Sequence, residues 1–397
     1  MSTDGLLRPP AFHETLMPSS NRGPRAFVWV ATAVLAMLVA AAAFSHFAIR
    51  AAETLPSRLT DQEFWSLSQD SSEPNGFFQS DNLLSNEIWL QWVIPDLVKR
   101  TGPGGVYMGV GPEQNYTYIA ALKPKMVFLP DIRRGNLDLQ LMYKAIFELS
   151  ADRADFVSRL FSRKRPSGLT ERSSVAEIFD AYDMVDTGSA DVYKQNLKAI
   201  DDELTVRHHL PLSSDDLDGI EYVYDKFFEF GPNINYGSSQ GNMNRGRFVT
   251  YADLMESTDA GGVARGYLAT EDNFKIVKEL EEKNLMVPVV GDLSGPKAMR
   301  AIGRYLKEHG ATVTAFYLSN VEQYLQRSNT MGKFLCNIAS MPLDEHSTFI
   351  RSQNGGGQRP PFAGGFGGGF GGFGGRGGLM SYLGSMKDDA KGCSTGR

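Results

Sequence analysis

The sequence predicts a doubly wound α/β fold, a mostly parallel sheet with helices on both of its faces. Short apolar runs alternate with amphipathic helical patterns over much of the chain, which is the order of parallel strands joined by helical crossovers. Four of the apolar runs end in glycine or polar residues, as strands do at the edge of a sheet where ligands bind. The domain that holds them is expected over residues 59–351.

The first part of this domain is expected to contain two strands. Residues 59–100 indicate two helices around a turn, with Thr60 and Ser85 as their N-caps. A break rich in glycine and proline follows. The next expected elements are a strand over 106–110, a helix over 113–122, a strand over 125–132 and a helix over 136–149.

A helical insertion over about 166–250 interrupts the alternation, and no strand is evident in its sequence. The alternation then resumes. The remaining expected elements are a helix over 270–284, a strand over 285–293, a helix over 295–310, a strand over 311–320, a helix from residue 321, a strand over 333–339 and an edge strand over 348–351.

The N-terminal region predicts a membrane anchor. Residues 1–25 are expected to be a disordered cytoplasmic tail and residues 26–48 a transmembrane helix or signal anchor, because the run FVWVATAVLAMLVAAAAF has 18 residues and no charge. Three arginines precede the run, so the positive-inside rule places the body outside the cytoplasm. The small residues of segment 48–53 keep open a cleaved signal and a secreted or periplasmic protein. A buried soluble helix is a further interpretation.

The C-terminal region, residues 352–397, is rich in glycine and is expected to be disordered. It is interpreted as a flexible extension or as a segment that associates with envelope proteins. Cys336 and Cys393 are not expected to form a disulfide framework, and the six histidines lack the spacing of metal ligands, so no metal is expected. The net charge of −6 and the lack of a basic stripe argue against a nucleic-acid partner.

Candidate binding residues lie at the ends of the expected strands. Gly109 and Gly111 permit a tight turn and a close approach to a ligand after the first strand. Asp131 follows Gly111 by 20 residues and ends the next strand, where an acid accepts hydrogen bonds from a ribose. The alternative is a structural turn with a capping aspartate. A third glycine is absent, since position 114 is Gln, which argues against NAD and FAD.

Four segments resemble the motifs of class I S-adenosylmethionine-dependent methyltransferases, which have a Rossmann-like fold. They are VYMGVGPEQ, FLPDI, VVGDL and AFYLSNVEQYL. The whole body is also similar to a family of uncharacterised bacterial proteins with a methyltransferase-like fold. Pro112 and Glu113 depart from the small residues that are usual after the first motif.

The resemblance implies S-adenosylmethionine as the cofactor and assigns residues to it. The implied cofactor-binding residues are Gly109, Gly111 and Glu113 at the first turn, Asp131 at the ribose and Asp292 near the adenine. Ser319, Asn320 and Tyr324 would face the substrate, and Glu322 would be the catalytic base. The alternative is that Glu322 is an N-terminal helix residue favoured by the helix dipole.

Two functions therefore stay open. The first is a methyltransferase, or a descendant that still binds a nucleoside-like ligand. The second is a non-enzymatic envelope protein that retains the fold as an interaction scaffold. An open cleft lined by acids favours the first, and a cleft filled by Tyr116, Arg133 or the Pro112 turn favours the second. The polar segments 80–82 and 85–87 are expected to be turn and cap residues.

Overall fold

A computed structural model describes residues 53–185, 189–240, 248–354 and 379–393. The expected cytoplasmic tail (1–25) and membrane helix (26–48) lie outside these ranges. Within them, no helix is both long enough and apolar enough to cross a membrane.

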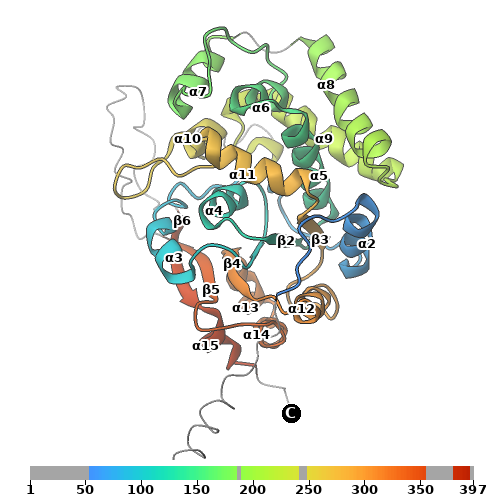
Figure 1. Ribbon diagram of the computed structural model, residues 1–397, viewed down its shortest axis with the longest axis vertical. Helices are drawn as coiled ribbons and strands as arrows, with labels where there is room; N and C mark the ends of the chain where they lie inside the picture. The colour runs from blue at the N-terminus through green and yellow to red at the C-terminus, as the bar shows by residue number, and fades with distance from the viewer. Residues whose placement is uncertain (1–52, 186–188, 241–247, 355–378, 394–397) are drawn as a thin grey trace, which may run out of the picture. The chain divides into compact units, whose positions relative to one another are not determined.

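The centre of the structure is a sheet of six strands in the order β3-β2-β1-β4-β5-β6 (Figure 1). The strands are β1 (Val106–Gly109), β2 (Met126–Asp131), β3 (Met286–Val290), β4 (Val313–Ser319), β5 (Thr348–Asn354) and β6 (Leu379–Ser385). All neighbouring pairs are parallel except β5 and β6, which are antiparallel. The predicted α/β fold with a mostly parallel sheet is confirmed.

The chain reverses its direction of winding beside β1. From β1 the chain adds β2 and then β3 on one side, and it returns to add β4, β5 and β6 on the other side. The carboxyl ends of β1 and β4 are therefore neighbours from which the crossovers leave in opposite directions. In open α/β sheets this switch point is where a ligand crevice forms.

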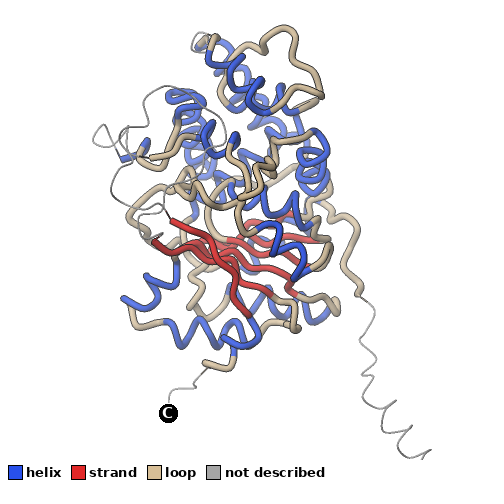
Figure 2. Tube along the Cα trace, turned by 90° about the vertical axis from the view of Figure 1, so that its left-hand side faces the viewer, coloured by secondary structure: helices blue, strands red, loops and turns tan. Residues whose placement is uncertain are grey.

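Helices cover both faces of the sheet (Figure 2). The helices outside the insertion are α2 (Asp61–Ser71), α3 (Ile94–Thr101), α4 (Gln114–Leu122), α5 (Arg134–Leu149), α6 (Arg153–Leu160), α11 (Glu271–Glu282), α12 (Ala298–Glu308), α13 (Val321–Arg327), α14 (Met331–Ala339) and α15 (Met386–Ala390). Helices α4, α5 and α11 pack together on one face, and α12 and α14 lie on the other (Figure 1).

The insertion is mainly helical in the residues described, as predicted, and an isolated β-bridge joins Asn235 to Thr250. Its helices are α7 (Val175–Asp183), α8 (Ala190–Asp202), α9 (Ser214–Phe230) and α10 (Tyr251–Glu256), with a π-helical turn at Glu203–Arg207 and 3-10 turns at Gly231–Asn233 and Ser238–Gln240. Serine or threonine N-caps with an acid three residues later begin α7, α9 and α10. Helix α9 packs along α5, which joins the insertion to the sheet domain.

The free edge of the sheet at β3 is protected. Pro288 lies within β3 and has no N–H to offer, which suits a strand with only one neighbour. The carbonyl of Pro288 accepts a hydrogen bond from Ser68 of α2 at 2.6 Å. Helix α2 therefore covers an edge that would otherwise be open to another strand. Thr60 and Glu63 form the predicted capping box of α2.

The C-terminal region differs from the prediction in three ways. Residues 333–339, predicted as a strand, belong to α14, since their apolar residues serve one face of an amphipathic helix. Residues 379–390 form β6 and α15, and β6 covers β5, which is therefore not the edge. Cys336 and Cys393 form a disulfide that joins α14 to the end of α15. The glycine-rich residues 355–378 lie outside the described part of the chain.

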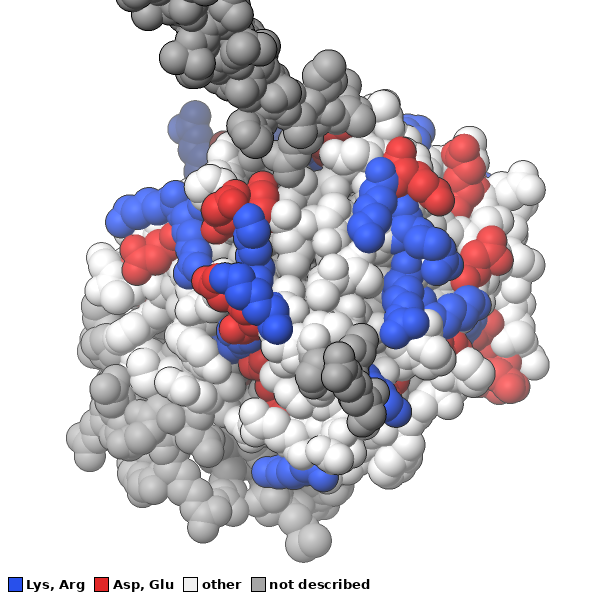
Figure 3. Space-filling view, turned by 90° about the horizontal axis from the view of Figure 1, so that it is seen from below, with Lys and Arg blue, Asp and Glu red and all other residues white. Residues whose placement is uncertain are grey.

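The face of the sheet domain near α12 to α15 carries its charges in separate groups. Figure 3 shows lysine and arginine side chains on two sides of an uncharged strip, with acidic side chains beside both groups.

Candidate functional site

The predicted strand ends meet at one cavity of about 610 Å³. It lies at the carboxyl edge of β1, β2, β3 and β4, and so at the switch point of the sheet. Its size falls within the range of small-molecule sites. Among the residues that line it are Phe77, Phe78, Ser85, Glu87, Gly111, Asp131, Arg133, Tyr236, Asp292, Tyr317, Ser319, Asn320, Tyr324 and Arg327.

The turn after β1 is built around Asn115. The Asn115 amide donates hydrogen bonds to the carbonyls of Val110, Gly111 and Pro112, and its carbonyl oxygen accepts one from the Tyr107 hydroxyl. A Cβ on Gly109 would lie 1.8 Å from this oxygen, so Gly109 makes room for Asn115. Gly109 itself is not among the lining residues. Gly111 has a φ of +77°, lines the cavity and takes the conformation that glycine allows.

Asp131 lies directly beside the first turn. Its carboxylate accepts hydrogen bonds from the backbone N–H of Gly111 at 3.2 Å and of Arg133 at 3.0 Å. Burial raises the pKa of Asp131, although the Arg133 charge and these two hydrogen bonds act in the opposite direction. The predicted proximity of Gly111 and Asp131 is therefore present, and the acid borders the cavity. Its ribose contact stays a prediction.

Asp292 borders the same cavity from the end of β3. One of its carboxylate oxygens accepts hydrogen bonds from the N–H and the hydroxyl of Ser294, both at 2.8 Å. Its own N–H donates to Glu73 at 3.2 Å. The carboxylate is thus fixed by the turn that follows β3.

Glu113 lies outside the cavity lining, which differs from its predicted cofactor contact. Its buried carboxylate accepts hydrogen bonds from the Ser85 N–H at 3.2 and 3.3 Å. Burial raises the pKa of Glu113 to about 8. The residue therefore holds the segment around Ser85 against the first turn.

Glu322 is also outside the lining and is not placed as a base. Its two carboxylate oxygens accept hydrogen bonds from Arg351 at 2.7 and 2.9 Å, in a bidentate contact that engages both of them. Three other predicted substrate-facing residues, Ser319, Asn320 and Tyr324, do line the cavity.

Glu87, expected to be a turn residue, is an unforeseen part of the site. It is 1% exposed, and it reaches the cavity wall from the segment before α3. Its carboxylate accepts hydrogen bonds from Ser319 of β4 at 2.5 Å and from Ser352 of β5. Burial raises the pKa of Glu87, and hydrogen bonds from Ser319, Ser352 and Tyr317 offset that rise only in part. Apolar residues flank Glu87 in the sequence, but that local pattern does not identify its hydrogen-bond partners on β4 and β5.

The cavity is not filled by Tyr116, Arg133 or the Pro112 turn, whose presence in it would favour the scaffold alternative. Tyr116 is buried beside it and donates its hydroxyl to Gln140 at 2.6 Å, and neither Tyr116 nor Pro112 is a lining residue. Arg133 lies in the wall, where its guanidinium donates to the carbonyl of Asp81 and pairs with the Asp81 carboxylate at 3.7 Å.

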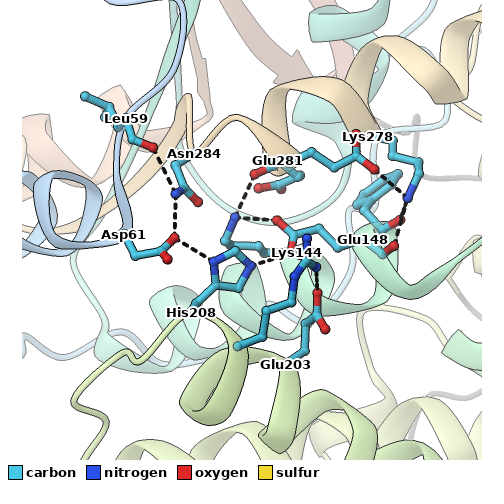
Figure 4. A network of polar contacts seen from close by, with 12 residues as sticks. Leu59, Asp61, Lys144, Glu148, Glu203, His208, Lys278, Glu281 and Asn284 are labelled. Carbon is cyan, nitrogen blue, oxygen red and sulfur yellow. Dashed lines mark hydrogen bonds and ion pairs between the residues drawn. The ribbon is translucent and has the colours of Figure 1, made fainter.

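A second polar cluster lies where α2, α5 and the π-helical turn of the insertion meet (Figure 4). Lys144 donates to Glu148 and to the carbonyl of Glu281, both at 2.7 Å. His208 lies between Asp61 at 2.6 Å and Glu148 at 2.5 Å. Burial by itself would raise the pKa of Glu148, but His208 and Lys144 lower it to about 2.

Three members of this cluster have the spacing of metal ligands. The ligand atoms of Glu148, Glu203 and His208 lie within 4.8 Å of one another. Arg207 pairs with both carboxylates and Lys144 with Glu148, so positive charge is already supplied by the chain. These contacts are those of an ion-pair network that ties the insertion to the sheet domain.

The fold and the cavity define a Rossmann-like α/β protein with an open pocket at the topological switch point. Within that class, the chain belongs to the family defined by a domain of unknown function, DUF7790, whose model matches residues 83–212 and 236–364. The two matched ranges lie on either side of part of the insertion. The expected membership of an uncharacterised family is confirmed.

Other comparisons add little. The structure is similar to that of the rRNA methyltransferase aviRa from Streptomyces viridochromogenes, with 12% sequence identity and a TM-score of 0.24, over 72% of this chain and 86% of that one. This TM-score is too low to support the fold assignment, which is based on the order and direction of the strands. No curated protein matches the sequence significantly.

Proposed function

We propose that the cavity at the switch point binds a nucleoside-like small molecule, with S-adenosylmethionine as the first candidate. The observation that carries this proposal is the position of Asp131, which borders the cavity from the end of β2 and touches the Gly111 turn. An acid at this place in a doubly wound sheet is suited to accept hydrogen bonds from ribose hydroxyls.

The reaction that would follow is methyl transfer, which needs mainly the positioning of donor and acceptor. Glu322 is committed to Arg351 and is no longer proposed as a base. Ser319, Asn320 and Tyr324 lie in the wall where an acceptor would enter. We keep methyl transfer as the activity to test once a ligand is found.

The test of the proposal is calorimetric titration of the full chain, purified in detergent, with S-adenosylmethionine, S-adenosylhomocysteine and adenosine. We expect micromolar binding of at least one ligand, and a loss of about tenfold or more in Asp131→Asn, equivalent to about 1.4 kcal/mol. The matched control is Asp96→Asn, which changes an exposed acid that pairs with Lys99 on α3. No heat with any ligand, from protein shown to be folded by circular dichroism, would refute the proposal.

The alternative is a scaffold without a ligand. It is favoured by one observation, that both oxygens of Asp131 already accept a backbone N–H. Each carboxylate oxygen can accept a second hydrogen bond, so these contacts also suit an acid held ready for a ligand.

We further propose that residues 26–48 anchor the body outside the cytoplasm. The Cys336–Cys393 disulfide supports this, because disulfides persist in oxidising compartments. S-adenosylmethionine is expected to be scarce outside the cytoplasm. The main proposal is therefore ligand binding, and methyl transfer is proposed only if the domain has access to this methyl donor. Protease protection of spheroplasts tests the topology: digestion of the body from outside is expected, and protection of it would contradict the proposal.

The glycine-rich residues 355–378 remain proposed as a contact for envelope partners. In the sequence these residues lie between β5 and β6. Deletion of residues 355–378 tests partner binding while the edge strand β6 is retained.

A further inference from the structure

Glu87 is a buried acid whose partners are all neutral. Its described hydrogen bonds come from the hydroxyls of Ser319, Ser352 and Tyr317. Among the residues that the structure describes, no lysine, arginine or histidine forms an ion pair with it. A carboxylate buried in this way either holds a proton or needs a positive charge from elsewhere.

The two arginines in the cavity wall are engaged with other groups. Arg133 is held by Asp81, and its charge offsets part of the rise that burial causes in the pKa of Asp131. Arg327 lies over the ring of Tyr324, with 5.5 Å between the guanidinium carbon and the ring centroid. Neither arginine therefore supplies a positive charge that would pair with the Glu87 carboxylate.

The backbone conformation at Ser319 places its hydroxyl within hydrogen-bond distance of Glu87. Ser319 has a φ of +51°, a left-handed conformation that side chains other than glycine, asparagine and aspartate rarely adopt. The pairing of β4 with β5 shifts register between Tyr317 and Ser319. Such strain is retained at binding sites when it positions a functional group. Here it brings the Ser319 hydroxyl to the carboxylate at the cavity wall.

Aromatic rings share the cavity with this acid. Tyr317, Tyr324, Phe78 and Tyr236 line it, and Phe78 packs edge-on against Tyr324 at 5.2 Å. The face of an aromatic ring attracts a cation, most strongly where water is excluded. The lining thus combines a buried negative group with several electron-rich rings.

We propose that this cavity selects a ligand with a compact positive charge, and that Glu87 together with the neighbouring aromatic rings supplies the recognition of that charge. The inference rests on the proposed function, since it concerns the same cavity, and it names the chemical class of the ligand: a nucleoside-like molecule that carries a sulfonium or ammonium group.

The test compares two ligands that differ at the sulfur. S-adenosylmethionine has a positive sulfonium, and S-adenosylhomocysteine has a neutral thioether with the same nucleoside and amino-acid parts. Each is titrated calorimetrically into the full chain in detergent, as wild type, Glu87→Gln and Glu113→Gln. Glu113 is the matched control, a second buried glutamate with a raised pKa that does not line the cavity.

We expect wild-type protein to bind S-adenosylmethionine about tenfold or more tightly than S-adenosylhomocysteine. Glu87→Gln is expected to lower the affinity for S-adenosylmethionine by about tenfold and to change the affinity for S-adenosylhomocysteine by about twofold or less. Glu113→Gln is expected to keep the wild-type ratio of the two affinities. If Glu87→Gln keeps the wild-type ratio of the two affinities, or loses affinity equally for both ligands, the inference is wrong even though the cavity binds the ligands. Binding of neither ligand to folded wild-type protein would instead remove the proposed function.

A second variant keeps the test decisive if Glu87→Gln does not fold. Tyr324 is half-buried and lines the cavity. Tyr324→Leu removes its aromatic ring, and Tyr324→Phe keeps the ring. We expect Tyr324→Leu to reduce the preference for the charged ligand by roughly threefold or more and Tyr324→Phe to preserve it. Equal behaviour of both variants would contradict the role of the ring.

Discussion

Glu87 and Glu148 are both buried acids, but their surroundings differ in kind. Glu148 pairs with Lys144, His208 and Arg207. Burial alone would raise its pKa, but His208 and Lys144, which Figure 4 shows beside it, lower the pKa to about 2. Glu87 is surrounded by hydroxyls, and burial raises its pKa. Burial alone therefore does not mark a functional acid; what distinguishes the two is whether the protein supplies a counter-charge.

The two regions also differ in what their contacts join. The cluster around Glu148 connects α2, α5 and the insertion, and it lies apart from the cavity lining. The contacts of Glu87 join β4 and β5 to the segment before α3 at the cavity itself. We infer that the first region stabilises the fold and the second serves a ligand, and the following changes test that difference.

The largest effect is expected from Lys144→Met. Removal of this lysine leaves Glu148 buried beside fewer positive partners, so the free energy of unfolding should fall by about 3–5 kcal/mol in urea denaturation. Lys198→Met is the matched control, because Lys198 makes the same i,i+4 contact with Asp202 but is exposed, and about 0.5 kcal/mol or less is expected there. Similar losses in both variants would mean that burial does not set the strength of the pair.

Cys393→Ser is expected to cost about 2–4 kcal/mol of unfolding free energy, since the disulfide closes a loop of 57 residues. The loss should be concentrated at the cavity side, because β6 covers β5, the strand that carries Ser352. Amide hydrogen exchange should increase in β5 and remain slow in α5. Faster exchange in α5 of the same size would show that the two regions are not independent.

Glu113→Gln is expected to stabilise the protein at alkaline pH. The folded pKa of about 8 lies above the ordinary value of 4.5, so the folded state binds the proton more tightly and wild-type stability declines as pH rises from about 4.5 to about 8. The variant lacks this decline, so its stability relative to wild type should rise by about 3 kcal/mol between pH 5 and pH 8. Urea denaturation at pH 5 and pH 8 measures the difference, and equal pH dependence in both proteins would refute it.

His208→Gln is expected to have the smallest effect and the opposite pH profile. Burial would lower the pKa of His208, but Glu148 and Asp61 raise it above its ordinary value of 6.5. The contribution is therefore complete below pH 6.5 and is lost as pH rises through the folded pKa. The variant should lose about 1–2 kcal/mol at low pH and less above the transition.

His209→Gln is the control for this change, because the neighbouring histidine is exposed. Its stability should follow wild type at every pH. A pH-independent loss in His208→Gln would indicate that only the shape of the imidazole matters.

The sheet could be predicted from the sequence because its signals are local. Buried parallel strands such as residues 126–131 and 286–290 are short apolar runs between helical patterns, and Gly111 and Asp131 are separated by one strand and one helix. That spacing alone was enough to predict their proximity. The glycine-rich segment hid β6, because it separates this strand from its partner β5 by residues without a periodic pattern.

The chemistry at the cavity was harder to predict because it depends on contacts between distant residues. Glu322 pairs with Arg351, which is 29 residues away. Glu87 accepts hydrogen bonds from Ser319 and Ser352, which are 232 and 265 residues away. Glu113 occupies the place of a ligand residue in the motif, but its side chain turns to Ser85. Sequence patterns of one segment do not encode such partners.

The most direct test of the difference between the two acids is a paired measurement on Glu87→Gln and Glu148→Gln. Each variant is assayed for its free energy of unfolding and for its affinity for S-adenosylmethionine. We expect a crossed result: Glu148→Gln loses about 3 kcal/mol or more of stability and keeps its affinity, whereas Glu87→Gln keeps its stability and loses affinity about tenfold. If Glu87→Gln loses stability and leaves the affinity unchanged, Glu87 is a structural residue and the assignment of the cavity acid is wrong.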